Sequence, residues 1–243
     1  MKLTLEYLGT DFAGWQRQLP RFRTVQQVLE EAIEKMTREK VFVRGAGRTD
    51  AGVHAKGQVA NFRSTSAIPL IGFLRGLNGT LPPDVSVVSV DEADPAFDAL
   101  RYAKGKHYTY RIWNREARAP LRASTSWHVY RHLDFEAMKE AARHLAGEHD
   151  FTSFRAADCD RRNPVRQMRR IEVSTPEPHL IAIDLESTGF LKHMVRVIAG
   201  TLFEVGAGFR RSDEIPTILA ARDRTRAGRT APSSGLTLEK VFY

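Results

Sequence analysis

The sequence predicts an α+β protein, because segments with the composition of strands alternate with segments of helical periodicity. Residues 85–90 are a run of Val and Ser, which is typical of a short strand. Residues 25–36 carry apolar side chains at helical spacing, after a capping-box start in which Thr24 is followed by Gln27. A chain of 243 residues can bury a core as one domain or two small ones, and we favour two closely packed halves.

Six elements are predicted in the first half of the chain. Strands are expected at residues 3–8, 41–43, 58–62 and 85–90, and helices at 25–36 and 69–77. The resulting order is strand, helix, strand, strand, helix, strand. This order is the ferredoxin-like βαββαβ pattern, in which helices cover one face of an antiparallel sheet.

The second half is predicted to repeat this pattern. A strand at 106–113 precedes a helix capped by Asp134, an antiparallel pair at 168–173 and 180–185, a helix at 190–205, a helical stretch at 215–221 and a final strand at 236–242. No residue-level repeat is present, so the duplication is predicted from the element pattern alone. With a junction at 91–95, the two predicted halves are residues 1–95 and 96–243.

The charge of the chain favours an anionic partner. A formal net charge of +8 and a pI near 9.8 point to nucleic acid rather than to a membrane. No apolar run approaches the roughly 20 residues that span a bilayer, and the amino terminus lacks a signal-peptide core, so we expect a cytoplasmic protein.

Cys159 is the single cysteine, which excludes an internal disulfide and a cysteine-based zinc site. Candidate RNA contacts are Trp15, Arg17, Arg21 and Arg23, a basic cluster of Arg161, Arg162, Arg166, Arg169 and Arg170, and a second one of Arg222, Arg224, Arg226 and Arg229.

The segment 45–54 contains the strongest candidate for a catalytic group, the carboxylate of Asp50. It follows the strand-like run 41–43 and is rich in glycine, so we expect Asp50 on a loop that leaves a buried strand. Arg48 is suited either to keeping that carboxylate ionised or to contacting a phosphate. From the residues alone, an ordinary surface turn explains the segment equally well.

Two further segments combine chemistry with regular structure. Cations alternate with aromatic residues at 104–111, where Tyr108 and Tyr110 share one face of the predicted strand and either stack on bases or pack in the core. On the helix at 190–205, the apolar stripe is a core face, and Arg196 lies off that stripe. By default such an arginine is a solvated charge.

The motif GRTDAGVHA at 47–55, followed by GQV at 57–59, resembles the active-site signature of the tRNA pseudouridine synthase A (TruA) family. Residues 190–196 (FLKHMVR) resemble its second signature, and residues 230–232 and 235–236 are also similar, so the resemblance covers essentially the whole chain. It implies the pseudouridine synthase fold, with the sheets of the two halves side by side and an active-site cleft between them. It also implies a homodimer that needs no cofactor or metal and converts uridine to pseudouridine at positions 38 to 40 of the tRNA anticodon stem-loop.

The resemblance assigns roles to individual residues. Asp50 matches the nucleophile, Tyr108 matches a tyrosine that lies against the target base, and Arg196 matches an arginine that pairs with the nucleophile. Arg48 is suited to filling the gap left when the uridine leaves its stack. The chain departs from the family at 97–100, where Phe-Asp-Ala-Leu replaces Phe-His-Ala-Arg, so that Leu100 replaces an arginine.

Two other functions remain open at this point. The first is a non-catalytic tandem RNA-binding protein of RRM-like topology, in which Asp50 is a turn residue. The second is an N-glycoside hydrolase that would release free uracil. A lone carboxylate without a second one at a defined spacing makes the hydrolase the weaker alternative.

Overall fold

The computed structural model describes residues 1–19 and 21–243, which divide into two compact units. The first unit consists of Met1–Lys104 with Leu238–Tyr243, and the second of Gly105–Thr237. These bounds differ from the predicted halves because the segment after residue 95 packs on the first unit. The Asn61 side chain donates to the Phe97 carbonyl at 3.1 Å and accepts from the Ala99 amide at 2.8 Å.

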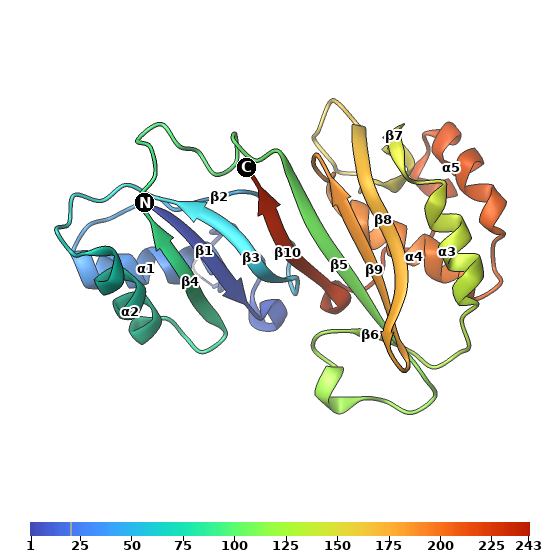
Figure 1. Cartoon of the computed structure of the whole chain (residues 1–243), viewed down its shortest axis with the longest axis horizontal. Helices are drawn as coiled ribbons and strands as arrows, with labels where there is room; N and C mark the ends of the chain where they lie inside the picture. The colour runs from blue at the N-terminus through green and yellow to red at the C-terminus, as the bar shows by residue number, and fades with distance from the viewer. Residues whose placement is uncertain (20) are drawn as a thin grey trace. The chain divides into compact units, whose positions relative to one another are not determined.

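The first unit has the predicted ferredoxin-like order of strands and helices (Figure 1). Antiparallel ladders join β1 to both β3 and β4, and β2 to β3, while β10 pairs with β3. The strand order β4–β1–β3–β2 is that of the split βαβ arrangement. The elements are β1 (Lys2–Tyr7), α1 (Val25–Thr37), β2 (Arg44–Gly45), β3 (His54–Asn61), α2 (Leu70–Thr80), β4 (Val85–Asp91) and β10 (Leu236–Phe242), of which β10 begins in the second unit.

Local signals fix the two helices of this unit. Thr24 caps α1 as predicted, since its hydroxyl accepts a hydrogen bond from the Gln27 amide at 3.3 Å. Pro69 lies immediately before α2, where its fixed φ and missing amide cost nothing. The helices pack together where Met36 of α1 meets Gly76 of α2, and an added Cβ at Gly76 would lie 2.4 Å from the Met36 methyl carbon.

The predicted strand at 41–43 is wrong. Phe42 is exposed, and β2 begins only at Arg44. The backbone of Val43 is bonded instead to two polar side chains of α1: its amide donates to Glu30 Oε1 at 3.1 Å, and its carbonyl accepts from Gln26 Nε2 at 3.1 Å. These side chains take the place of a neighbouring strand at Val43, so residues 41–43 lead into the Asp50 loop as irregular backbone.

The second unit repeats the arrangement around a longer sheet. Its strands lie in the order β5–β9–β8–β7 with antiparallel ladders, and β6 pairs with β5 in parallel. The order β5–β9–β8 with helices α3 and α4 matches β1–β3–β2 with α1 and α2, which confirms the predicted α+β class. The elements are β5 (Gly105–Asn114), β6 (Trp127–Val129), α3 (Phe135–Arg143), β7 (Gly147–Asp150), β8 (Val165–Glu177), β9 (Leu180–Ser187), α4 (Met194–Gly206) and α5 (Ile215–Ala221).

Two details of this unit differ from expectation. Helix α4 begins at Met194 rather than near residue 190, because His193 has a left-handed backbone with φ 61°, which ends the preceding turn. Strands β6 and β7 are short and were not predicted. As predicted, Asp134 caps α3 by accepting from the Ala137 amide at 2.9 Å.

Across residues 1–19 and 21–243, no helix combines the length and apolar character needed to cross a membrane.

Candidate active site

The Asp50 loop is anchored on both sides of the carboxylate. Thr49 is buried, its hydroxyl is hydrogen-bonded to the Tyr7 hydroxyl at 2.8 Å, and its carbonyl accepts from the Trp15 amide at 3.0 Å. On the other side, the Val53 amide donates to the Asp50 carbonyl at 3.1 Å and closes a turn. The backbone of Asp50 is therefore fixed, while its side chain is half-buried at the surface of the unit.

Two glycines permit this close packing. Gly14 has φ 100°, and a Cβ at this position would lie 2.7 Å from the Thr49 carbonyl oxygen. Gly52 has φ 77°, and its amide donates to the Phe12 carbonyl at 3.2 Å. L-residues with a side chain rarely adopt such angles, so both sites favour glycine. The Asp50 loop is thus packed tightly against the segment that follows β1.

The candidate RNA contacts of that segment lie in different environments, and the exposed Arg21 stays a prediction. Trp15 is 4% exposed and packs on Gly45, where an added Cβ would lie 2.5 Å from the indole ring, so the expectation that it touches RNA is wrong. Arg17 Nη1 pairs with Glu30 Oε2 at 2.7 Å, and Arg23 Nη1 pairs with Asp84 Oδ2 at 2.6 Å. The segment also contains residue 20, which lies outside the described residues.

Arg48 lies exposed two residues before Asp50. No ion pair of Arg48 is present in the described part of the chain, and its expected effect on the Asp50 carboxylate stays a prediction. Its other expected role, contact with RNA, stays a prediction.

The two tyrosines of β5 occupy different environments. Tyr108 is 8% exposed and meets the Phe190 ring edge-on at a centroid distance of 5.1 Å. Tyr110 is fully buried and its hydroxyl donates to the Pro232 carbonyl at 2.8 Å. Burial raises the pKa of Tyr110 far above its usual range, so this phenol stays protonated at any physiological pH. Tyr110 is therefore a core residue.

Arg196, in the first turn of α4, is held by the chain rather than solvated. Its Nε donates to the Ala231 carbonyl at 2.8 Å, and the Ala231 amide donates back to the Arg196 carbonyl at 3.0 Å. The segment around Ala231 is itself fixed on α4, because the Gly228 amide donates to Thr201 Oγ1 at 2.9 Å and the Arg229 amide to Glu204 Oε1 at 2.9 Å. This anchorage could not be predicted from sequence spacing, since Arg196 and Ala231 are 35 residues apart.

Asp98, in the segment 97–100, is a structural residue. Its carboxylate pairs with Arg44 Nη1 at 2.7 Å and accepts from the backbone amides of Leu100 and Arg101 at 3.0 and 3.1 Å. Although partial burial opposes it, this set of hydrogen bonds lowers the pKa of Asp98 below its usual value. Leu100 is 43% exposed and the displaced Arg101 side chain is 81% exposed.

The two basic clusters differ in how their charges are used. In the second cluster, Arg222 pairs with Asp150 at 3.2 Å and Arg229 with Glu204 at 3.9 Å, while Arg224 donates to the Thr230 hydroxyl at 3.1 Å. In the first cluster, Arg170 pairs with Glu172, whereas Arg161 and Arg166 pair with no carboxylate in the described residues.

Nowhere in residues 1–19 and 21–243 do three His, Cys, Asp or Glu side chains gather as a metal site would require.

Of the four predicted site residues, Asp50 and Arg48 belong to the first unit, and Tyr108 and Arg196 to the second. Tyr108 and Arg196 share the second unit with Tyr110, whose pKa is influenced by the Arg196 charge after the larger effect of burial. The Asp50–Arg196 ion pair stays a prediction, as does the role of each of the four residues in catalysis.

Comparison with known proteins assigns the chain to a family. A family model described as tRNA pseudouridine synthase matches residues 4–102 and 141–243. Proteins named tRNA pseudouridine synthase A are similar over the whole chain: that of Myxococcus xanthus is 51% identical with 91% of its length covered, and that of Geobacter sulfurreducens is 46% identical with 99% covered. Among solved structures, a chain of a Cbf5–Nop10–Gar1 complex aligns with 98% of this chain and 48% of its own length, at 15% identity and a TM-score of 0.37. On the family model and the full-length relatives together, the chain belongs to the tRNA pseudouridine synthase family.

Proposed function

We propose that this protein isomerises uridine to pseudouridine in the anticodon stem-loop of tRNA, at positions 38 to 40, with Asp50 as the nucleophile. The observation that carries the proposal is the anchorage of Asp50: buried Thr49 and the Asp50–Val53 turn fix the backbone of a carboxylate that remains partly accessible. Family membership over the full length supports the same reaction.

The reaction requires the target uridine to leave its stack, which costs a few kcal/mol. Arg48, exposed beside the Asp50 loop, fills the gap in the RNA. Asp50 then enables cleavage of the glycosidic bond, the uracil turns while still bound, and its C5 rejoins the sugar. The base is retained, so the isomerisation balances without an oxidant, a reductant or water.

Two residues of the second unit complete the proposed site. Tyr108 lies against the target base, and its edge-on contact with Phe190 supports a fixed ring orientation. Arg196 pairs with Asp50, and its bond to the Ala231 carbonyl supports a fixed guanidinium. A fixed cation beside a carboxylate favours the ionised form that a nucleophile needs.

The decisive experiment compares wild type with Asp50→Asn on an unmodified tRNA transcript, without added metal or cofactor. Pseudouridine is mapped after nuclease digestion, and tRNA binding is measured in parallel. We expect pseudouridine in the anticodon arm from wild type, none from Asp50→Asn, and nearly equal binding by both, because the basic surface supplies most of the affinity. Asp91→Asn, which changes an exposed carboxylate at the end of β4, is the matched control and should keep full activity.

Each alternative function gives a different result in this experiment. Binding without any product would identify a non-catalytic RNA-binding protein, and free uracil would identify an N-glycoside hydrolase. Activity of Asp50→Asn comparable to wild type would contradict the role of Asp50.

The role of Tyr108 is tested by comparing two substitutions. If the ring stacks on the target base, Tyr108→Phe should retain much more activity than Tyr108→Ala, because phenylalanine keeps the aromatic face. The rate of pseudouridine formation at saturating tRNA is the measurement. An equal loss in both variants would assign the role to the hydroxyl instead.

We also propose that the protein acts as a cytoplasmic homodimer in which two subunits share one tRNA. The family resemblance suggests this arrangement. Sedimentation velocity with and without tRNA tests it, and a monomer under both conditions would contradict it.

A further inference from the structure

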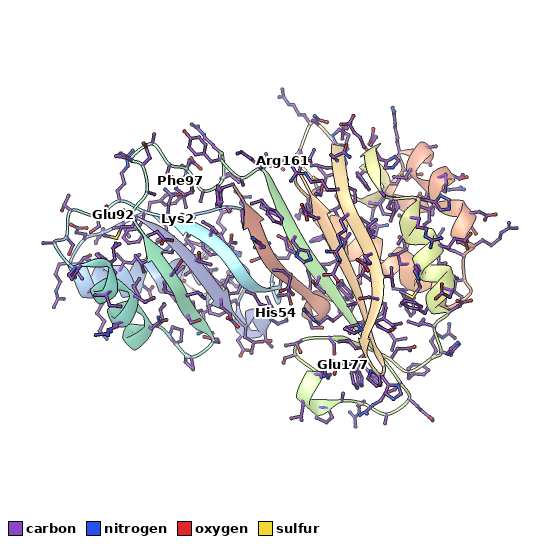
Figure 2. The ribbon with its side chains drawn as sticks, viewed as in Figure 1. Lys2, His54, Glu92, Phe97, Arg161 and Glu177 are labelled. Carbon is purple, nitrogen blue, oxygen red and sulfur yellow. The ribbon has the colours of Figure 1, made fainter. Side chains whose placement is uncertain are left out.

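Three cations gather at the end of the second-unit sheet where β5 and β8 begin. Lys106 is the second residue of β5, Arg166 is the second residue of β8, and Arg161 lies in the connection that precedes β8. Figure 2 shows Arg161 at this end of the sheet. We refer to Lys106, Arg161 and Arg166 as the Lys106 cluster.

Strand register places Lys106 and Arg166 on one face of the sheet. Lys106 pairs with Ser187 of β9, and Ser187 pairs with Met168 of β8. Paired residues on neighbouring strands share a face, and so do residues two apart on one strand, such as Met168 and Arg166. By the same alternation, Lys106 shares its face with Tyr108.

The cluster is partly pre-organised. Arg166 Nη1 donates to the Asn163 carbonyl at 2.9 Å and to the Val165 carbonyl at 2.6 Å. The backbone next to Arg161 is also held, because Arg155 Nη1 donates to the Arg161 carbonyl at 3.0 Å. The Arg166 guanidinium and the backbone at Arg161 are therefore held by the protein, which lowers the cost of ordering them when a ligand binds.

No carboxylate neutralises these charges within the described part of the chain. Of the acidic groups nearby, Glu186 pairs with Arg169 at 3.8 Å and Asp158 pairs with Lys192 at 2.5 Å. Asp160 adjoins Arg161 in the sequence but is exposed, and it forms no ion pair with any residue that the structure describes.

The like charges act on one another. Burial, followed by the positive charge of Arg161, lowers the pKa of Lys106 to about 8. The same two causes lower the pKa of Arg166, against a small opposing effect of Cys159. Cations that mutually disfavour their charged forms become more stable when an anion binds between them.

We propose that Lys106, Arg161 and Arg166 form a binding site for a backbone phosphate of the RNA, next to the nucleotide at Tyr108. Two residues of a strand span roughly 7 Å, which is comparable to the size of one nucleotide. The choice of RNA as ligand, and of the Tyr108 nucleotide as neighbour, rests on the proposed function. The second basic cluster is the weaker candidate, because the charges of Arg222 and Arg229 are paired with the carboxylates of Asp150 and Glu204.

The first test measures how salt affects the affinity for tRNA. Kd for an unmodified transcript is determined for wild type, Lys106→Met and Arg161→Met between about 50 and 200 mM salt, a range over which affinity that comes from phosphate contacts falls steeply. Each variant should bind several-fold more weakly and lose about one unit of slope in log Kd against log salt. Lys139→Met removes a lysine of α3 that pairs with Glu136 at 3.9 Å, and as a matched control it should change neither quantity. Wild-type affinity and slope in both cluster variants would overturn the proposal.

The second test uses the lowered pKa of Lys106. An anion favours the charged amine, so tRNA binding should be accompanied by proton uptake, and affinity should fall as pH rises from about 7 to 8.5. Lys106→Arg keeps its charge throughout this range and should flatten the dependence while retaining affinity. If Lys106→Arg shows the same pH dependence as wild type, the assignment to Lys106 is wrong.

The two proposals fail in different ways. If the cluster variants show the same salt and pH dependence as wild type, while wild type forms pseudouridine normally, the phosphate site alone is overturned. If the expected salt and pH differences are found but wild type forms no pseudouridine, the proposed reaction is overturned and the phosphate site is supported.

Discussion

The hydrogen bond between Tyr7 and Thr49 provides a direct test of how the Asp50 loop is held. The two hydroxyl oxygens lie 2.8 Å apart, and both residues are buried, with Tyr7 3% and Thr49 6% exposed. Burial raises the pKa of Tyr7 to about 12, in spite of hydrogen bonds with Thr49 and Gln58 that lower it. We consider Tyr7→Phe, Thr49→Val and the double variant, which remove this bond with little change in side-chain volume.

The expected magnitudes follow from the burial of both partners. A typical intramolecular hydrogen bond contributes about 1 kcal/mol, and leaving one buried partner unsatisfied costs about 1 to 3 kcal/mol. Each single variant should therefore lower the free energy of unfolding by roughly 1 to 2 kcal/mol. The double variant leaves no orphaned partner in this pair, so its loss should fall short of the sum of the single losses by about 1 kcal/mol.

Equilibrium urea denaturation followed by circular dichroism measures these differences, and pseudouridine formation is measured on the same preparations. Both single variants should also lower kcat more than tRNA affinity, because Thr49 directly precedes Asp50 in the chain. Losses that add within about 0.3 kcal/mol would show that the bond does not couple the two residues, and would refute this account of the loop.

Two further predictions concern packing and pH. Gly200→Ala should destabilise the protein by several kcal/mol or prevent folding, because the added Cβ would lie 1.9 Å from the Arg229 carbonyl oxygen; an unfolding free energy within about 0.5 kcal/mol of wild type would contradict this packing. The hydrogen bonds from Arg23 lower the pKa of Asp84, so their stabilisation should be present above about pH 4 and lost as pH falls through the lowered pKa of the folded protein. The gap in unfolding free energy between wild type and Asp84→Asn should therefore shrink toward acid pH, and a gap that stays constant down to about pH 2 would contradict this assignment.

Elements with strong local signals were predicted correctly. The caps at Thr24 and Asp134 and the strands at 85–90 and 106–113 depend on side chains within a few residues, and the structure confirms them with small shifts at their ends. The failure at 41–43 has a long-range cause. Glu30 and Gln26 lie on the buried face of α1, and only the folded chain shows that they bond to Val43 rather than to solvent.

The sequence by itself determined the family, and with it the identity of the candidate nucleophile. A motif of contiguous residues around Asp50 carries that information, because such a motif is visible in the order of the residues without any knowledge of the fold. The alternation of strands and helices in each half was equally accessible, since hydrophobic periodicity and caps are local properties.

Only the tertiary structure decided which side chains are buried within the protein or paired with other side chains. Trp15 and Arg222 read as RNA contacts in the sequence, yet one is buried on Gly45 and the other is paired with Asp150. Conversely, Lys106 and Arg161 lie 55 positions apart and meet at one end of a sheet without a carboxylate partner in the described residues. Composition counts charges, but burial and pairing between distant segments determine which of them remain available to a ligand.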